Sequence, residues 1–364
     1  MRKLQLLLLL FFFGTLASAQ VPAGYYNAAV GKSGEELRTA LYNIIKTHNA
    51  VDYGYLWTAF QSTDKMESGY VWDIYSDVPG GTAAYYFAFG TNQCGSYSQE
   101  GNCYNREHTV PQSWFGDAVP MKTDLFHIYP TDGWVNNKRA NFPYGTVASP
   151  TWTSTNGSKL GPCSYPGCSG TAFEPIDAYK GDLARGFFYM SVCYKDKNLG
   201  QTGESVFSGS ELVAWARDMF VAWHEADPVS EKEINRNNVI YSNIQHNRNP
   251  FIDCPELVDY LFGSRTNEPW YPTCVDWVEI PENQIFTTSC SLYPNPAAGN
   301  VTIESSENQI ITVEICDLTG RELLSRECIG ASTCQMDLGD LSAGTYFVKV
   351  KTLRTVEVMK LVVR

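Results

Sequence analysis

One feature constrains the fold more than any other: the residue pattern changes close to residue 267. Upstream of that point, apolar residues recur at the spacing of one helix face, over 33–47, 182–194, 211–225 and 230–245, and a short helix starts at Pro255. Downstream, turn signals separate short alternating β-branched segments, at 301–304, 310–316, 346–351 and 356–363. These patterns predict an α+β domain of mixed helices and strands, followed by a small all-β sandwich.

The chain begins with the pattern of an export signal. Arg2 and Lys3 precede an apolar run, and Ala17-Ser18-Ala19 provides a small-residue cleavage site before Gln20. The apolar run is too short to favour a spanning helix, so we expect no transmembrane segment. The expected product is a monomer that is secreted or held at the cell surface. Its parts are a signal peptide (1–19), a first domain (20–266), a linker (267–284) and a β-sandwich (285–364).

Eleven cysteines fit the oxidising surroundings of a secreted protein. Their spacing favours two local disulfides, Cys94 with Cys103 and Cys163 with Cys168. The remaining connectivity cannot be read from the sequence. The odd number leaves at least one cysteine without an intramolecular partner.

Two further segments of the first domain have a distinctive composition. Residues 70–75 and 85–90 are aromatic and β-branched, which predicts strands. Residues 145–170 are rich in Gly, Pro, Ser and Thr, which predicts a long surface loop closed by the second disulfide.

The net charge of −12 limits how the chain can meet an anionic partner. Proteins that bind nucleic acid through bulk charge make their phosphate contacts with Lys and Arg. An acidic chain is a poor candidate for that mode of binding. A cleft in which a cation and a few basic side chains act locally is still compatible with this charge.

Residues 104–141 carry the most informative constellation. The order of residue types predicts a strand that ends near His108, a second strand, and a short helix that Asp132 caps. On that helix Asn136 and Arg139 lie on one face. A hook of this kind places the end of the first strand opposite the helix, so that a metal ion can be held between them.

The residue types in this hook suit the hydrolysis of a phosphodiester. The reaction needs a base for the attacking water and positive charge for the phosphorane and the departing oxygen. The imidazole of His108 suits the first role, and with an ordinary pKa it would lose activity below about pH 6. The oxygens of Glu107 and Asn136 suit Mg²⁺, or Ca²⁺ or Mn²⁺ in its place. Neighbours on a regular strand point to opposite faces, so Glu107 and His108 can converge only where the strand breaks.

At these residues the chain closely resembles the endonuclease I family, which consists of secreted or periplasmic nucleases with a ββα-metal active site. The resemblance runs from about residue 53 to residue 262, and several motifs occur in the family's order. It implies that His108 is the general base and that Glu107 and Asn136 bind the metal. It also implies cleavage of DNA, and often RNA, with little sequence preference and a 5′-phosphate product. The motifs are Arg106-Glu107-His108 with Pro111 and Trp114, Val135-Asn136 with Arg139 and Asn141, Phe173-Glu174-Pro175, Lys180 to Arg185, and Gln245 with Asn247 to Asp253.

The chain departs from the family where some relatives carry an arginine that stabilises the transition state. The stretch from Trp114 to Lys122 is short here and contains no arginine. Arg139 is therefore the candidate for that role, with Arg106 and Lys122 as substitutes, and a structural ion pair is the competing role for Arg139. We leave His127 out of the active centre.

The C-terminal module resembles the sorting domain of the type IX secretion system. That resemblance implies that the secretion machinery carries the chain across an outer membrane. The residues that carry the likeness are Tyr293-Pro294-Asn295-Pro296, Asp317 to Arg321 and Leu341 to Tyr346.

Two other functions compete with a nuclease. A noncatalytic surface module could keep this fold and bind extracellular DNA or glycans; the acidic charge favours it, and the intact Glu107, His108 and Asn136 oppose it. A cysteine-histidine hydrolase is more distant, because no cysteine has a local setting typical of a nucleophile.

Overall fold

A computed structural model describes residues 21–200, 206–274, 290–306, 310–317, 320–339, 341–352 and 356–364. The described chain forms two compact units. One consists mainly of residues 45–255, and the other of residues 23–44 and 256–364. The expected signal peptide lies outside the described residues, and so does most of the expected linker. Within the described residues, no helix is both long and apolar enough to cross a membrane.

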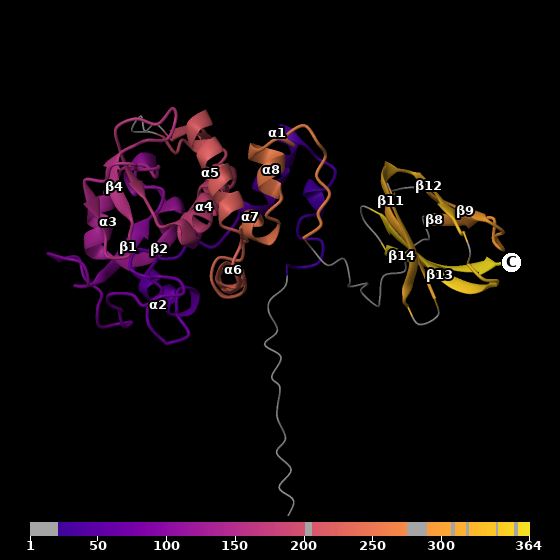
Figure 1. Cartoon of the computed structure of the whole chain (residues 1–364), viewed down its shortest axis with the longest axis horizontal. Helices are drawn as coiled ribbons and strands as arrows, with labels where there is room; N and C mark the ends of the chain where they lie inside the picture. The colour runs from indigo at the N-terminus through magenta and orange to yellow at the C-terminus, as the bar shows by residue number, and fades with distance from the viewer. Residues whose placement is uncertain are drawn as a thin grey trace, which may run out of the picture. The chain divides into compact units, whose positions relative to one another are not determined.

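The first unit mixes helices with short strands, as Figure 1 shows. Its helices are α2 (Leu56–Thr63), α3 (Gly133–Arg139), α4 (Lys180–Cys193), α5 (Ala214–Ala226), α6 (Glu231–Asn243) and α7 (Pro250–Asp253). Its strands are β1 (Tyr104–His108), β2 (Ile128–Asp132), β3 (Trp152–Thr153), β4 (Lys159–Pro162), β5 (Thr171–Glu174), β6 (Phe207–Ser208) and β7 (Glu211–Leu212).

The hook of strand, strand and helix is present as predicted. β1 and β2 pair antiparallel, with Glu107 opposite Tyr129 and His108 opposite Ile128. Asp132 ends β2 and caps α3, because its Oδ1 accepts a 2.9 Å hydrogen bond from the Val135 amide. The cap satisfies one of the amides that a helix start leaves unpaired, so α3 begins immediately after the second strand.

The long helix α4 forms the centre of this unit. Every residue from Gly181 to Cys193 is buried, and a helix that is apolar on most sides belongs in the interior. Gly186 lets the helix approach the segment before β2, because a Cβ there would stand 3.1 Å from the Phe126 carbonyl oxygen. α4 thereby supports the turn that leads into the hook.

Buried arginines tie the helices to the hook. The Arg185 guanidinium of α4 donates to both Glu233 carboxylate oxygens of α6, at 2.6 and 2.8 Å. Arg236 of α6 donates to Asp64 at 2.7 Å and to the Ile128 carbonyl of β2 at 2.8 Å. Each buried cation has an anionic partner, so the cost of removing it from water is offset.

The predictions for two loop-rich parts of this unit were wrong. Residues 70–75 and 85–90 are not strands; one backbone hydrogen bond, from the Val71 amide to the Phe87 carbonyl, joins them. Val71 and Phe87 are buried together with Tyr104, so these segments are held by side-chain packing and need no ladder. The segment 145–170 is not a continuous loop, because it contains β3 and β4, and β4 pairs with β5.

The second unit contains almost all of α1 (Gly34–Ile45), α8 (Leu257–Phe262) and the C-terminal strands. The strands form two sheets, in the orders β11-β10-β13-β14 and β12-β9-β8, whose inward residues share one buried apolar cluster. The expected all-β sandwich is therefore confirmed. Its strands are β8 (Cys290–Tyr293), β9 (Asn300–Ser305), β10 (Ile310–Cys316), β11 (Glu322–Ala331), β12 (Thr333–Asp337), β13 (Gly344–Thr352) and β14 (Val356–Val363).

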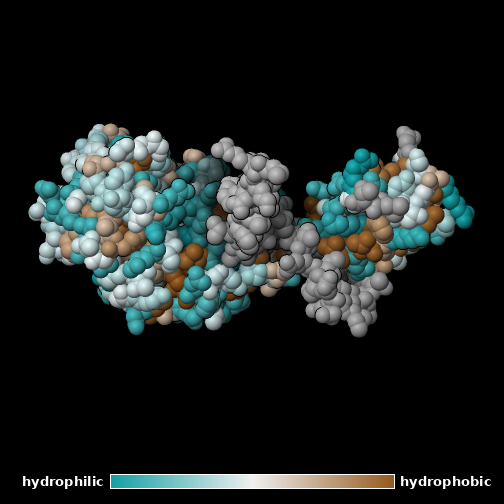
Figure 2. All heavy atoms as spheres, turned by 90° about the horizontal axis from the view of Figure 1, so that it is seen from below, coloured by the Kyte–Doolittle hydropathy of each residue, from teal (hydrophilic) through white to brown (hydrophobic). Residues whose placement is uncertain are grey.

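Disulfides reinforce both units. The two expected bridges, Cys94–Cys103 and Cys163–Cys168, are present, and Cys328–Cys334 closes a short loop of the sandwich. Cys254 and Cys274 are also disulfide-bonded. Three cysteines keep buried thiols, namely Cys193, Cys290 and Cys316. In the space-filling view, hydrophilic residues cover much of the visible surface of each part, with hydrophobic residues between them (Figure 2).

Candidate active site

His108 is the last residue of β1, and its ring is held from two sides. The ring stacks on Tyr53, with centroids 6.0 Å apart and planes 23° apart. Its Nε2 lies 3.0 Å from the Lys122 carbonyl oxygen. A carbonyl can only accept, so Nε2 carries the proton and Nδ1 presents a lone pair. Nδ1 has no hydrogen-bond partner among the described residues, which leaves it available as a base.

The surroundings of His108 keep its ring neutral. Burial lowers the pKa of His108 to about 3, and the His127 ring, 5.7 Å away between centroids, lowers it further. Both effects disfavour the imidazolium, because a positive charge in a buried, water-poor site is poorly solvated. The imidazole is therefore in the form that accepts a proton throughout the neutral pH range.

Glu107 precedes His108 and is buried. All of its described hydrogen bonds and its ion pair go to one carboxylate oxygen, Oε1, which accepts from the Tyr75 hydroxyl at 2.8 Å and from the Tyr144 hydroxyl at 3.5 Å. The same oxygen lies 3.1 Å from the Arg139 guanidinium. Burial raises the pKa of Glu107, and Arg139 counteracts that rise. Oε2 has no partner among the described residues, so one oxygen is left for a ligand.

Arg139, at the end of α3, is buried, and both terminal nitrogens of its guanidinium contact the hook. Besides the ion pair with Glu107, it donates to the backbone carbonyls of His108 and Thr109. Its guanidinium also lies 4.6 Å from the centroid of the Tyr144 ring. These contacts favour a structural ion pair, the second of the two roles considered for this residue.

Asn136, in the middle of α3, is half-buried and faces β1. Its amide nitrogen donates to the Arg106 carbonyl at 3.4 Å. This bond fixes which end of the amide is nitrogen, and Oδ1 has no partner among the described residues. A carboxylate oxygen and an amide oxygen are ligands that hard divalent cations prefer, so the residues present fit such an ion.

The structure brings the four candidate residues onto one hook but does not join them all. Glu107 and Arg139 form an ion pair, and Asn136 bonds to the residue before Glu107. No hydrogen bond connects Glu107, His108 and Asn136 directly within the described part of the chain. The register of β1 stays regular to its end at His108, and the two neighbours have different partners. Glu107 contacts Tyr75 and Tyr144, whereas His108 contacts Tyr53, as alternation along a strand requires.

Several functional neighbours were absent from the sequence-based site. Tyr75 and Tyr144 orient the Glu107 carboxylate, Tyr53 supports the His108 ring, and His127 lies beside it. His127 itself is buried, with Nε2 2.7 Å from the Met121 carbonyl. Tyr53 and Tyr75 lie far from the motif in sequence and Tyr144 follows its end, so no spacing rule could have placed them around Glu107 and His108.

Two cations surround the ring of Tyr53. The Arg106 guanidinium lies 3.7 Å from the ring centroid and donates to the Tyr53 carbonyl at 3.0 Å. The Lys122 ammonium lies 5.4 Å from the same centroid and 3.1 Å from Asp117. The Lys122 side chain is 29% exposed, so its ammonium can exchange Asp117 for a phosphate at little cost.

Comparisons with known proteins place both parts of the chain in known families. A family model described as Endonuclease I matches residues 33–256. A second model, described as Secretion system C-terminal sorting domain, matches residues 291–364. Together they confirm the two resemblances and the expected order of an α+β domain and an all-β region.

Curated relatives have matching names. The extracellular ribonuclease of Bacillus amyloliquefaciens is 32% identical over 246 residues, which are 65% of this chain and 78% of the relative. The extracellular ribonuclease of Bacillus subtilis (strain 168) is 31% identical over 264 residues, covering 68% and 84%. An extracellular deoxyribonuclease of Aeromonas hydrophila is 29% identical over 172 residues, covering 40% and 64%. The names support a nuclease over a noncatalytic binding module.

Proposed function

The chain belongs to the endonuclease I family, and from this premise we propose that it cuts both DNA and RNA with little sequence preference, leaving 5′-phosphates. It is a nuclease, which is a phosphodiester hydrolase, and it is secreted or held at the cell surface. Nucleases of this family generally depend on a divalent metal. We propose Mg²⁺ as the ion used here, with Mn²⁺ or Ca²⁺ as substitutes.

One observation supports the mechanism most strongly. Each of three side chains is held in the fold through one atom and leaves open the atom that the chemistry needs. These atoms are Nδ1 of His108, Oε2 of Glu107 and Oδ1 of Asn136. In the proposal, Nδ1 takes the proton of the attacking water, and the Lys122 carbonyl stabilises the proton on Nε2. The two oxygens would hold the cation, which when bound stabilises charge on the phosphorane and the departing oxygen.

The side chains of Glu107 and His108 point to opposite faces of β1, and this arrangement suits the reaction. In a direct displacement at phosphorus, the attacking and departing oxygens lie on opposite sides of the phosphorus atom. A base for the water and ligands for the leaving side are therefore needed on different sides. The regular strand supplies this separation, so a break in β1 is not needed.

The basic residues divide into two roles in this proposal. Arg139 positions Glu107, because its guanidinium is committed to that carboxylate and to two backbone carbonyls. Lys122 is the proposed phosphate contact, because its ammonium is partly exposed beside the ring of Tyr53.

Removing the metal tests the activity as a whole. Purified protein is expected to nick and linearise plasmid DNA in the presence of Mg²⁺, and an excess of EDTA should abolish cutting because the phosphorane loses its counter-charge. Adding back Mg²⁺ should restore the activity. Cutting that persists at full rate in EDTA would rule out the proposed mechanism, and no cutting of DNA or RNA under any condition would rule out the substrate class.

The pH dependence should lie lower than the sequence alone suggests. Burial lowers the pKa of His108 to about 3, so the ring stays neutral as pH falls through 6 and its Nδ1 lone pair remains open to the attacking water. At saturating Mg²⁺ we expect kcat to show no loss centred near pH 6.5, the ordinary value for histidine. A profile of kcat from about pH 4 to about pH 8, taken where circular dichroism is unchanged, measures this. A single protonation step at the ordinary histidine value would contradict it.

A further inference from the structure

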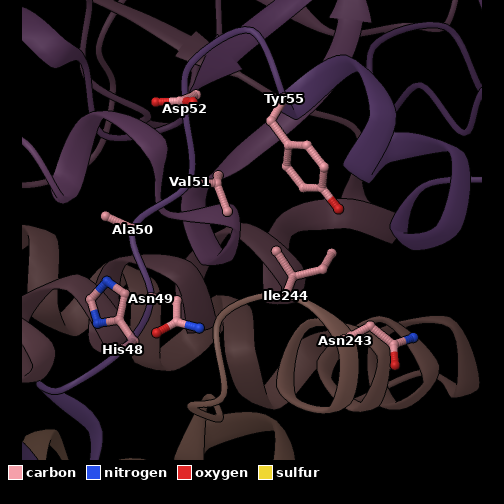
Figure 3. A pocket seen from close by; sticks show the side chains of 8 residues that line it. All are labelled: His48, Asn49, Ala50, Val51, Asp52, Tyr55, Asn243 and Ile244. Atoms are coloured by element: carbon pink, nitrogen blue, oxygen red, sulfur yellow. The ribbon is translucent and has the colours of Figure 1, made fainter.

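A polar pocket opens on the loop next to the active site (Figure 3). Its volume is about 600 Å³. Residues 48–52 and Tyr55 form one side, and Asn243 and Ile244 at the end of α6 form the other. Among the described residues, no lysine or arginine lines it, so the lining offers no cation for a phosphate.

The pocket and the active site share one short loop. Tyr53, whose ring stacks on His108, lies between the lining residues Asp52 and Tyr55. At the other end of the loop, Nε2 of His48 lies 3.6 Å from the carboxylate of Asp124, two residues after Lys122. The loop is thus anchored to the same segment whose Lys122 carbonyl holds the base, and through Tyr53 it also contacts the His108 ring.

The lining has the features of a site for a flat, polar ring. Tyr55 is 43% exposed, and in Figure 3 its ring extends from the loop toward Ile244. Val51 and Ile244 add apolar surface, and Asn49 adds an amide to the lining. Asp52 also lines the pocket, and in Figure 3 its carboxylate points away from the Tyr55 ring. An aromatic face, apolar side chains and one amide match the faces and the edge of a nucleobase.

We propose that this pocket receives one unpaired nucleobase of the strand being cut, so that the enzyme prefers single-stranded nucleic acid. This inference rests on the proposed function. A base in a duplex is stacked and paired, so it must be extruded before it can enter the pocket. Extrusion costs free energy, and an unpaired base in a single strand enters without that cost. The Asn49 amide both donates and accepts, so it can bond to any base. The pocket therefore selects for an unpaired strand and not for one base.

Tyr55→Ala tests the stacking face without disturbing the core, since this side chain is exposed. We expect KM for a single-stranded oligonucleotide to rise about tenfold, the size of one lost base-stacking contact, with kcat little changed. KM for the same sequence as a duplex should stay within about twofold. Tyr55→Phe keeps the ring and should behave as wild type. Tyr70→Ala removes a tyrosine of similar exposure (44%) elsewhere on the unit, and should leave both values unchanged.

A binding measurement separates this inference from the proposed activity. In a His108→Ala background, fluorescence anisotropy of a labelled single-stranded oligonucleotide should show the same tenfold loss of affinity on adding Tyr55→Ala. Equal losses on single strand and duplex, or no loss on either, would overturn the pocket assignment while cleavage stands. If the wild-type protein bound single strands through Tyr55 but cut neither DNA nor RNA, the proposed activity would be wrong and the pocket assignment would stand.

Discussion

His108→Ala should lower kcat by about 10²- to 10⁴-fold, the range that a general base contributes. The substitution removes Nδ1, the only ring nitrogen that the Lys122 carbonyl leaves open. Added imidazole should restore part of the activity, because a free base can enter the space of the missing ring. Steady-state kinetics on a defined oligonucleotide at saturating Mg²⁺ measure both effects.

His224→Ala is the matched control for this variant. His224 also places Nε2 against a backbone carbonyl, that of Pro255, at 3.1 Å, but it lies on α5 and not in the hook. Its loss should leave kcat per folded molecule unchanged. If His108→Ala kept kcat within about twofold of wild type, or if both variants fell alike, the role of His108 as base would be wrong.

Glu107→Gln and Asn136→Ala should each weaken Mg²⁺ or Mn²⁺ binding by at least about 100-fold. Outer residues around a metal commonly contribute 10- to 100-fold, and a direct ligand should contribute no less. Isothermal titration calorimetry measures the affinity. Asn137→Ala, at the next and exposed position of α3, is the control and should bind metal as wild type does. Unaltered affinity in both Glu107→Gln and Asn136→Ala would contradict the assignment.

The choice of glutamine at position 107 follows from the structure. The Glu107 carboxylate pairs with the buried Arg139, and breaking a buried pair costs about 3–5 kcal/mol. Glutamine keeps an acceptor for the Tyr75 hydroxyl and limits that cost. Thermal unfolding of each variant shows how much of the loss is due to stability.

The parts of the site that the sequence predicted are those that local chemistry determines. Asp132 caps α3 through an amide three residues away, so both the hook and the positions of Glu107, His108 and Asn136 on it follow from short-range rules. The helical periods of α4, α5 and α6 were readable for the same reason. The capping box that opens α6, Ser230 with Glu233, is a motif of the same short-range kind.

The parts that the sequence did not predict depend on distant contacts. Tyr75 reaches Glu107 across 32 positions, and nothing local distinguishes it from the other tyrosines. The role of Arg139 depends on its guanidinium lying 3.1 Å from the Glu107 carboxylate, and the separation of the two residues in the sequence does not predict that distance. The aromatic segments at 70–75 and 85–90 have strand-like composition, but their side chains pack without a ladder of backbone hydrogen bonds. Residue propensity cannot distinguish such a packed segment from a strand.

A crystal soaked in Mn²⁺, with the ion located from its anomalous scattering, tests the central claim most directly. We expect one ion bound by Oε2 of Glu107 and Oδ1 of Asn136, each about 2.0–2.3 Å away, with Nδ1 of His108 facing the water on the far side of a bound phosphate. An ion that binds elsewhere, or that touches only one of these two oxygens, would contradict the account.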